Sequence, residues 1–187
     1  MKASTLLKKI DDPRSLCETW QYFVDVPEVT YSHLADTCEL IHGGGCPVFL
    51  VNIKSHKEVR DALRCLAVFL RREGNYGAGF GLEDSTLADT ERPVEALVHT
   101  TYLTESRMWV RGYAAFSRWP DGHVPSWELS SAYFLPGARG RGSFAELINS
   151  AHTRYGDFTV QHPLSTRMQY LVNKHGKADE TVFTPHR

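Results

Sequence analysis

The sequence has no long apolar stretch and almost no net charge. Its first twelve residues, MKASTLLKKIDD, carry lysines after a short apolar pair, and no apolar run follows. We therefore expect neither a signal peptide nor a membrane-spanning segment there. The 21 basic and 22 acidic residues give a formal net charge of −1. This balance gives no global electrostatic reason to expect nucleic acid or an anionic membrane as a partner.

Cysteine is scarce, and the cysteines do not occur at the paired spacings of a disulfide framework or a metal site. The four cysteines are Cys17, Cys38, Cys46 and Cys65. This pattern is typical of reduced thiols, which predicts a cytoplasmic protein. His42 stands midway between Cys38 and Cys46. No fourth ligand is apparent and glycines interrupt the segment, so we expect no metal site.

Repeats and low-complexity segments are absent as well, which leaves a globular chain. Its 187 residues are 42% hydrophobic and 23% charged. That length and composition suit one domain with a modest extension and a sizeable core. We expect an N-terminal helical extension over residues 1–45 and the main domain over residues 46–187.

The first half of the chain alternates helical and extended patterns. Ser32–Ile41 has helical character and stops at a run of three glycines, and Pro47–Ile53 is a β-rich apolar run. Ser55 and Glu58 have the spacing of a capping box. They predict a helix that ends at Gly74, followed by a long loop over Asn75–Pro93.

The second half predicts a meander of strands followed by helix, strand and helix. Short connections between the three strand candidates favour antiparallel pairing. The fold class is therefore α+β, with one central, mostly antiparallel sheet flanked by helices. The predicted elements are the strands Val94–Leu103, Met108–Trp119 and Trp127–Leu135, the helix Ser143–Tyr155, the strand Asp157–Gln161 and the helix Ser165–His175.

The turn Leu135–Ser143 is the most informative segment. Its sequence, LPGARGRGS, combines glycines, which let a ligand approach the backbone, with two arginines, which donate to phosphate. The unpaired amides that open the following helix add an anion site. A flexible basic loop would have the same composition, so the turn alone does not decide between the two.

The flanks of this turn resemble the acetyl-coenzyme A binding core of the GNAT superfamily of acyltransferases. Val110–Ala115, VRGYAA, matches the family's strand of the form v-x-G-y-a-x. The family's next element, E-L/I-x-x-x-x-V-x-P-x-x-R-G-x-G, is matched by Glu128, Leu129, Phe134, Pro136, Arg139, Gly140 and Gly142. The resemblance covers about Val94 to Gly176. Phe144 departs from it, since the family has a small residue there.

The resemblance implies a cofactor site on this element. The backbone amides of Arg139, Gly140, Arg141, Gly142 and Ser143 would hold the pyrophosphate of acetyl-CoA. The main chain at Phe134 and Leu135 would pair with the pantetheine arm, where this strand parts from Asp157–Gln161. The Phe134 amide would then stabilise the charge that develops on the acetyl carbonyl.

The catalytic residues follow from the same comparison. Glu128 occupies the position of a catalytic glutamate in many family members, although a solvated strand-end carboxylate is an equal alternative. The tyrosine that often protonates the leaving thiolate is replaced by Val172. Tyr170 is the nearest tyrosine, about 200° away around a helix. His99, Tyr102 and His123 are further candidates on the acceptor side.

The sequence thus predicts an enzyme that moves an acetyl group from acetyl-CoA to an amine by direct attack. The partners expected are a coenzyme A thioester and an amine acceptor that the sequence does not identify. Two alternatives stay open: a catalytically degenerate binding or regulatory module, and an enzyme that modifies protein, tRNA or DNA. The oligomeric state is open, with a homodimer as the common soluble assembly.

Overall fold

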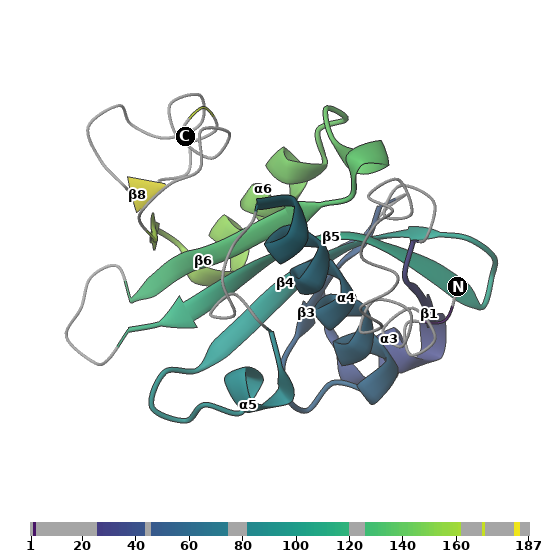
Figure 1. Ribbon diagram of the computed structural model, residues 1–187, viewed down its shortest axis with the longest axis horizontal. Helices are drawn as coiled ribbons and strands as arrows, with labels where there is room; N and C mark the ends of the chain where they lie inside the picture. The colour runs from purple at the N-terminus through teal and green to yellow at the C-terminus, as the bar shows by residue number, and fades with distance from the viewer. Residues whose placement is uncertain are drawn as a thin grey trace.

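A computed structural model shows a single eight-stranded sheet with helices on both faces (Figure 1). The structure describes Lys2, residues 26–43, 46–74, 82–119 and 126–161, Tyr170 and residues 182–183. The predicted class, an α+β fold with a mostly antiparallel sheet flanked by helices, is confirmed. The strands run in the order β2-β3-β4-β5-β6-β7-β8, and β1 pairs with β5.

The centre of the sheet is the predicted meander. The strands β4 (Val94–Tyr102), β5 (Arg107–Arg118) and β6 (Trp127–Phe134) pair antiparallel in sequence order. On one side follow β3 (Val48–Val51) and β2 (Glu39–His42). On the other side β6 pairs in parallel with β7 (Phe158–Val160), which pairs with β8 (Val182–Phe183).

Each face of the sheet carries its own core. Along β4, Ala96 and Val98 belong to one hydrophobic cluster and Leu97 to the other, as the alternation of a strand requires. The first cluster is covered by α4 (Lys57–Gly74) and the second by α6 (Ser143–Tyr155). Along α6, the buried residues Leu147, Ile148 and Ala151 recur at helical spacing, and Gly156 follows the end of the helix as predicted.

The N-terminal segment contributes strands as well as a helix. The helix predicted over 32–41 is α3 (Tyr31–Thr37), and it ends because Cys38 is extended and residues 39–42 pair with β3. β1 (Glu28–Thr30) pairs with the start of β5. Residues 3–25 lie outside the described part of the chain, so the division into an extension and a main domain stays a prediction.

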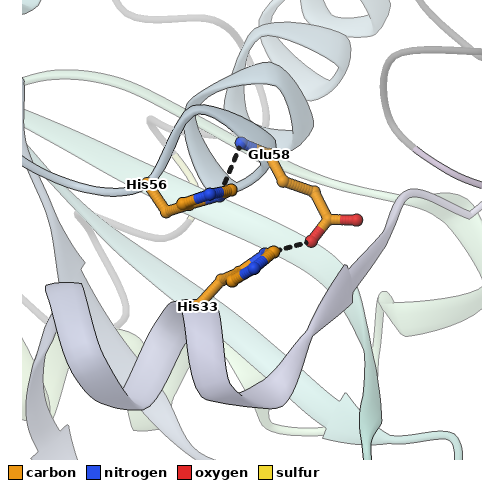
Figure 2. A group of neighbouring side chains, drawn as sticks. All are labelled: His33, His56 and Glu58. Carbon is orange, nitrogen blue, oxygen red and sulfur yellow. Dashed lines mark hydrogen bonds and ion pairs between the residues drawn. The ribbon is translucent and has the colours of Figure 1, made fainter.

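The predicted capping box at the start of α4 is wrong. The Ser55 hydroxyl accepts hydrogen bonds from the Asn52 amide at 3.0 Å and from the Cys38 thiol. The Glu58 amide donates instead to Nδ1 of His56 at 3.2 Å (Figure 2). The helix therefore begins at Lys57 with a histidine cap, and the Glu58 carboxylate is available for other contacts.

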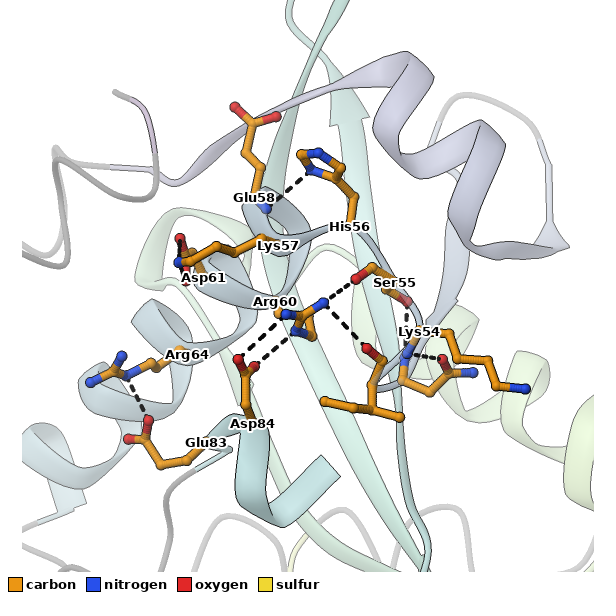
Figure 3. Close-up of polar contacts among 12 residues, drawn as sticks. Lys54, Ser55, His56, Lys57, Glu58, Arg60, Asp61, Arg64, Glu83 and Asp84 are labelled. Atoms are coloured by element: carbon orange, nitrogen blue, oxygen red, sulfur yellow. Dashed lines mark hydrogen bonds and ion pairs between the residues drawn. The ribbon is translucent and has the colours of Figure 1, made fainter. Parts of the chain in front are cut away.

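The segment predicted as a long loop contains a short helix. α5 (Asp84–Leu87) lies beside α4, and Arg60 joins them through an ion pair with Asp84 at 2.8 Å (Figure 3). The same guanidinium donates to the carbonyls of Ile53 and Ser55. Residues 75–81, and the predicted helix over 165–175 apart from Tyr170, lie outside the described residues. No described helix is long and apolar enough to cross a membrane.

Candidate functional site

The second half of β6 has an open edge. β6 pairs in parallel with β7 only through Glu128 opposite Thr159 and Leu129 opposite Val160. The Gln161 amide closes this short ladder on the Leu129 carbonyl at 2.9 Å. Past this point no described strand pairs with β6 on this side. The two strands therefore part as they approach the turn that leads to α6.

The point of separation coincides with a β-bulge at Ser130. Ala115 of β5 pairs with Ser131, and the next residue, Phe116, pairs with Leu129. Ser130 therefore has no residue opposite it in the register with β5, although its hydroxyl donates to the Ala115 carbonyl at 3.0 Å. A bulge bends its strand and changes which backbone groups face each neighbour. Here it shifts the alternation of β6 at the place where its pairing with β7 ends.

The Phe134 amide faces the open edge. The Leu135 amide donates to the Arg111 carbonyl at 2.9 Å, and Phe134 stands opposite Gly112. In an antiparallel ladder this makes Phe134 and Gly112 a non-hydrogen-bonded pair, whose N–H and C=O groups point away from each other's strand. The same alternation turns the amide of Ala132 to this edge. The edge thus offers two backbone donors to an extended ligand arm.

The turn between β6 and α6 is built on glycines in the left-handed region. Gly140 has φ +75° and Gly142, the residue before α6, has φ +82°. A Cβ placed on Gly137, Gly140 or Gly142 would meet no atom within 4 Å, so space in front of the turn is open. The first amides of α6, from Ser143 onward, have no intrahelical acceptor. This geometry suits an anion at the positive end of the helix.

The two arginines of the turn have different surroundings. Arg141 is exposed beside the open space. Arg139 donates to the Phe134 carbonyl at 2.7 Å and forms an ion pair with Glu73 at 2.6 Å. The hydroxyl of Tyr133 donates to the same Glu73 carboxylate at 2.6 Å. Arg139 therefore fastens the turn to the end of α4, whereas Arg141 is the free side chain that a phosphate would meet.

The Tyr133 hydroxyl is held in its protonated form. Burial raises the pKa of this hydroxyl well above its usual value, and the Glu73 carboxylate raises it further. The Arg139 guanidinium lies 5.2 Å from the centre of the Tyr133 ring, so the three side chains form one network. Glu73 was not expected from the sequence, because it lies 66 residues from Arg139.

Gly112 is required by the position of the Phe134 ring. A Cβ at Gly112 would lie 2.2 Å from Cδ1 of Phe134, far inside contact distance. The ring is buried and packs edge-on against His99 and Phe144. Phe144, which departs from the family pattern, thus contacts the residue whose amide faces the open edge. The glycine of the v-x-G-y-a-x strand has a steric reason in this structure.

The structure places Glu128, one of the two predicted catalytic residues, away from the Phe134 amide. Glu128 is six residues away, roughly 20 Å along an extended strand, and its carboxylate pairs with Arg92 at 2.7 Å. A base must lie within hydrogen-bond reach of the proton it removes, or one water away. Tyr170 is 63% exposed. Among the other candidates, Tyr102 is half exposed at the end of β4. His123 lies outside the described residues.

His99 lies on the face of the sheet covered by α6. Its side chain is fully buried, and Nε2 lies 3.0 Å from Oε2 of Glu146 in the first turn of that helix. Burial lowers the pKa of His99, against the opposing effect of Glu146. Arg111 and His42 lower it further. The neutral imidazole is therefore favoured at neutral pH.

A second group of polar side chains lies at the start of α4. His33 and His56 stack with ring centres 3.6 Å apart, and Nδ1 of His33 lies 2.7 Å from Glu58 (Figure 2). The Thr30 amide donates to the same carboxylate, and Arg107 lies 3.3 Å from its other oxygen. Burial alone would raise the pKa of Glu58, but these partners outweigh it and lower the pKa to about 2.

Comparison with known proteins finds similarity only among solved structures. No protein-family model matches the chain, and no curated protein does. Among the solved structures that match is a ribosomal-protein-alanine N-acetyltransferase from Brucella melitensis biovar Abortus 2308, with a TM-score of 0.49. The two chains are 16% identical, and the match covers 71% of this chain and 92% of that one. At this identity the likeness concerns the arrangement of elements and not the activity.

Proposed function

We propose that this protein is a GNAT-type N-acyltransferase that transfers an acetyl group from acetyl-CoA to an amine. The observation that carries the proposal is the open edge of β6 running directly into the glycine turn at the start of α6. A strand edge with free donors suits the amide-bearing pantetheine arm. A helix N-terminus with open space before it suits the pyrophosphate. The strand edge and the helix N-terminus are adjacent in the protein, as the pantetheine arm and the pyrophosphate are adjacent in coenzyme A.

The backbone and Arg141 supply the binding contacts in this proposal. The amides of Gly140, Gly142 and Ser143 and the exposed Arg141 side chain would hold the phosphates. Arg139 keeps the turn in place through Glu73 rather than contacting the ligand. When bound, acetyl-CoA supplies a thioester carbon that an amine attacks. The amides of Ala132 and Phe134 are the donors placed to stabilise the charge on its oxygen.

Direct binding of acetyl-CoA tests the site, and two glycines of α6 provide a matched pair of variants. Gly142 and Gly156 flank the helix at opposite ends, both with positive φ and both with open space at the Cβ position. Alanine should cost about 1–2 kcal/mol of stability at Gly142, which is in the αL region, and up to about 3 kcal/mol at Gly156, whose ψ is −134°. In calorimetric titration, Gly142→Ala should weaken acetyl-CoA binding at least about tenfold, which is 1.4 kcal/mol. Gly156→Ala should bind like the wild type.

Two outcomes would reject the cofactor site: absence of binding by the wild type at millimolar acetyl-CoA, or equal weakening by both glycine variants. The catalytic half of the proposal is measured separately, as release of free thiol in the presence of a panel of amines and amine-bearing peptides. Binding without thiol release on any acceptor would favour the degenerate binding module. Acetylation confined to a protein or to tRNA would favour the enzyme that modifies a macromolecule.

The predicted role of Glu128 as general base is tested by its amide variant. An acetyl group bound at Ala132 rather than Phe134 would lie two residues nearer to Glu128 but still roughly 13 Å away along the strand, so this role requires a relay of several waters. Glu128→Gln should then lower the rate of thiol release by about 10²–10⁴ and flatten its acidic pH dependence, with acetyl-CoA binding unchanged. A variant that keeps its rate and loses only thermal stability would assign Glu128 a structural role instead of a catalytic one.

A further inference from the structure

A second constellation lies on the α6 face of the sheet, on three separate elements. Cys46 precedes β3, His99 is in the middle of β4 and Glu146 is in the first turn of α6. One ligand atom from each, a thiol sulfur, an imidazole nitrogen and a carboxylate oxygen, lies within 4.8 Å of the other two. Cys46 and His99 are 53 positions apart in the sequence, and His99 and Glu146 are 47 positions apart. The fold nevertheless brings the three side chains together.

One atom of this group lacks the partner that its burial requires. His99 is fully buried, and its Nδ1 has no hydrogen-bond partner in the described structure. Nε2 can donate to Glu146, which leaves Nδ1 as a buried lone pair. Buried polar atoms are nearly always satisfied, and an ion is one of the few reasons for an exception. A cation on Nδ1 would pair with this lone pair directly, whereas a cation shared with Glu146 would bind Nε2 and place the ring proton on Nδ1.

The donor set selects the kind of cation. A thiolate, an imidazole and a carboxylate are the three ligand types of zinc in proteins. Their combined charge of −2 would balance a divalent ion. Tetrahedral zinc holds neighbouring ligand atoms roughly 3.3–3.8 Å apart, given its bond lengths. The present separations of up to 4.8 Å require only a closing movement of about 1 Å. We propose that Cys46, His99 and Glu146 form a zinc-binding site with an open fourth position.

The cluster of His33, His56 and Glu58 is the less suitable of the two candidate groups. Its carboxylate already receives the Thr30 amide and lies 3.3 Å from the Arg107 guanidinium, so a cation is repelled there. Nδ1 of His56 is occupied by the Glu58 amide. The group at Cys46 has a thiol in place of the second imidazole and an unpartnered ring nitrogen. The group at Cys46 is therefore better suited to bind a soft divalent ion.

Zinc affinity is the direct test, and it is independent of acyl transfer. The protein is stripped with a chelator, and Zn²⁺ is titrated in competition with a chromogenic chelator. We expect one equivalent bound by the wild type, with Cys46→Ala and Glu146→Gln each at least about tenfold weaker. Cys38→Ala and Glu58→Gln are the matched controls and should bind like the wild type. Equal affinity in all four variants, or loss only in Glu58→Gln, would overturn the proposal.

Cobalt spectra of the wild type test the proposed zinc site without requiring that the variants fold. Co²⁺ in a tetrahedral site with one thiolate gives intense visible bands and a sulfur-to-cobalt charge-transfer band in the near ultraviolet. We expect both in the wild type and in Cys38→Ala, and no charge-transfer band in Cys46→Ala. A wild-type spectrum typical of octahedral cobalt without sulfur would refute the site. A failure here leaves the acetyl-CoA proposal untouched, since that proposal rests on other atoms.

Discussion

At the scale of single residues, the contact between Gly112 and Phe134 controls the open edge of β6. The Phe134 ring occupies the place where a side chain on Gly112 would stand. Because the ring is buried between His99 and Phe144, rotating it away would disrupt dense packing and cost stability. Because the Phe134 amide is fixed by the same residue, a displaced ring also moves a donor of the proposed cofactor site.

We expect Gly112→Ala to lower the free energy of unfolding by about 1–3 kcal/mol, the usual result of overpacking a dense core. The added Cβ would lie 2.2 Å from the Phe134 ring. Urea denaturation measures the loss, with Gly137→Ala as the control. A Cβ at Gly137 meets nothing within 4 Å, so its effect should stay within about 0.5 kcal/mol. A Gly112→Ala protein as stable as the wild type would show that the ring can move freely.

Individual residues also show where sequence reasoning succeeds and fails at the site. The glycines and arginines at 139–142 determine the backbone of the turn through local sequence alone. The turn and its place before α6 were therefore predictable. The pairing of Arg139 with Glu73 was not, because the two are 66 residues apart. The meeting of Cys46 with His99 and Glu146 depends likewise on three elements, and the spacing of Cys46 with Cys38 pointed to nothing. Local patterns predict backbone geometry better than they predict side-chain partners.

At the scale of elements, Glu58 joins three parts of the N-terminal half. Its carboxylate accepts from the Thr30 amide at the end of β1 and lies 2.7 Å from His33 in α3. It also lies 3.3 Å from Arg107 at the start of β5. The side chain is 16% exposed, so these contacts are only partly screened by water. One side chain of α4 therefore holds the edge formed by β1 and α3.

This arrangement makes the stability contributed by Glu58 depend on pH. Its pKa of about 2 lies below the ordinary value of 4.5. The ionised form is therefore favoured by folding, and the stabilisation is complete above about pH 4.5 and lost as the pH falls toward 2. Above pH 5, Glu58→Gln should cost about 1–3 kcal/mol, a cost that shrinks between pH 4.5 and 2.

Urea denaturation at several pH values measures this difference, and Glu83→Gln is the control. Glu83 forms an ion pair with Arg64, but its side chain is 41% exposed. Such pairs contribute about 0–1 kcal/mol, so this variant should track the wild type at every pH. A gap between Glu58→Gln and the wild type that stays constant down to pH 2 would contradict the low pKa.

The elements themselves were predicted where one periodicity dominates. β4 and β5 are buried over long runs because both faces of the sheet are covered, and α6 buries one face at helical spacing. The helix predicted over 32–41 ends at Thr37 because residues 39–42 form a strand that pairs with the edge of β3. The capping box did not form because the Ser55 hydroxyl accepts from the Asn52 amide and the Glu58 amide donates to His56. Strand pairing thus outweighed a local helical preference, whereas the capping box was replaced by other contacts within three residues.

At the scale of the whole molecule, the proposed cofactor would lie where the sheet opens. The turn before α6 is fastened to α4 through Arg139 and Glu73, and α6 covers one face of the sheet while α4 covers the other. A ligand held on the turn and on the edge of β6 would therefore contact elements that depend on both cores. Its binding should stabilise the entire fold rather than one loop, and global unfolding is the appropriate measurement.

We expect acetyl-CoA to raise the midpoint of thermal unfolding in proportion to its occupancy. A ligand that binds only the folded state adds about 2.7 kcal/mol at a hundred times its dissociation constant. For a chain of this length, each kcal/mol shifts the midpoint by about 2–4 °C, so a shift of roughly 5–10 °C follows. Scanning calorimetry should show one transition that moves as a unit. A transition that splits, with only part of it shifted, would mean that the ligand stabilises a local element. That result would contradict a site built jointly on β6, α6 and the turn tied to α4.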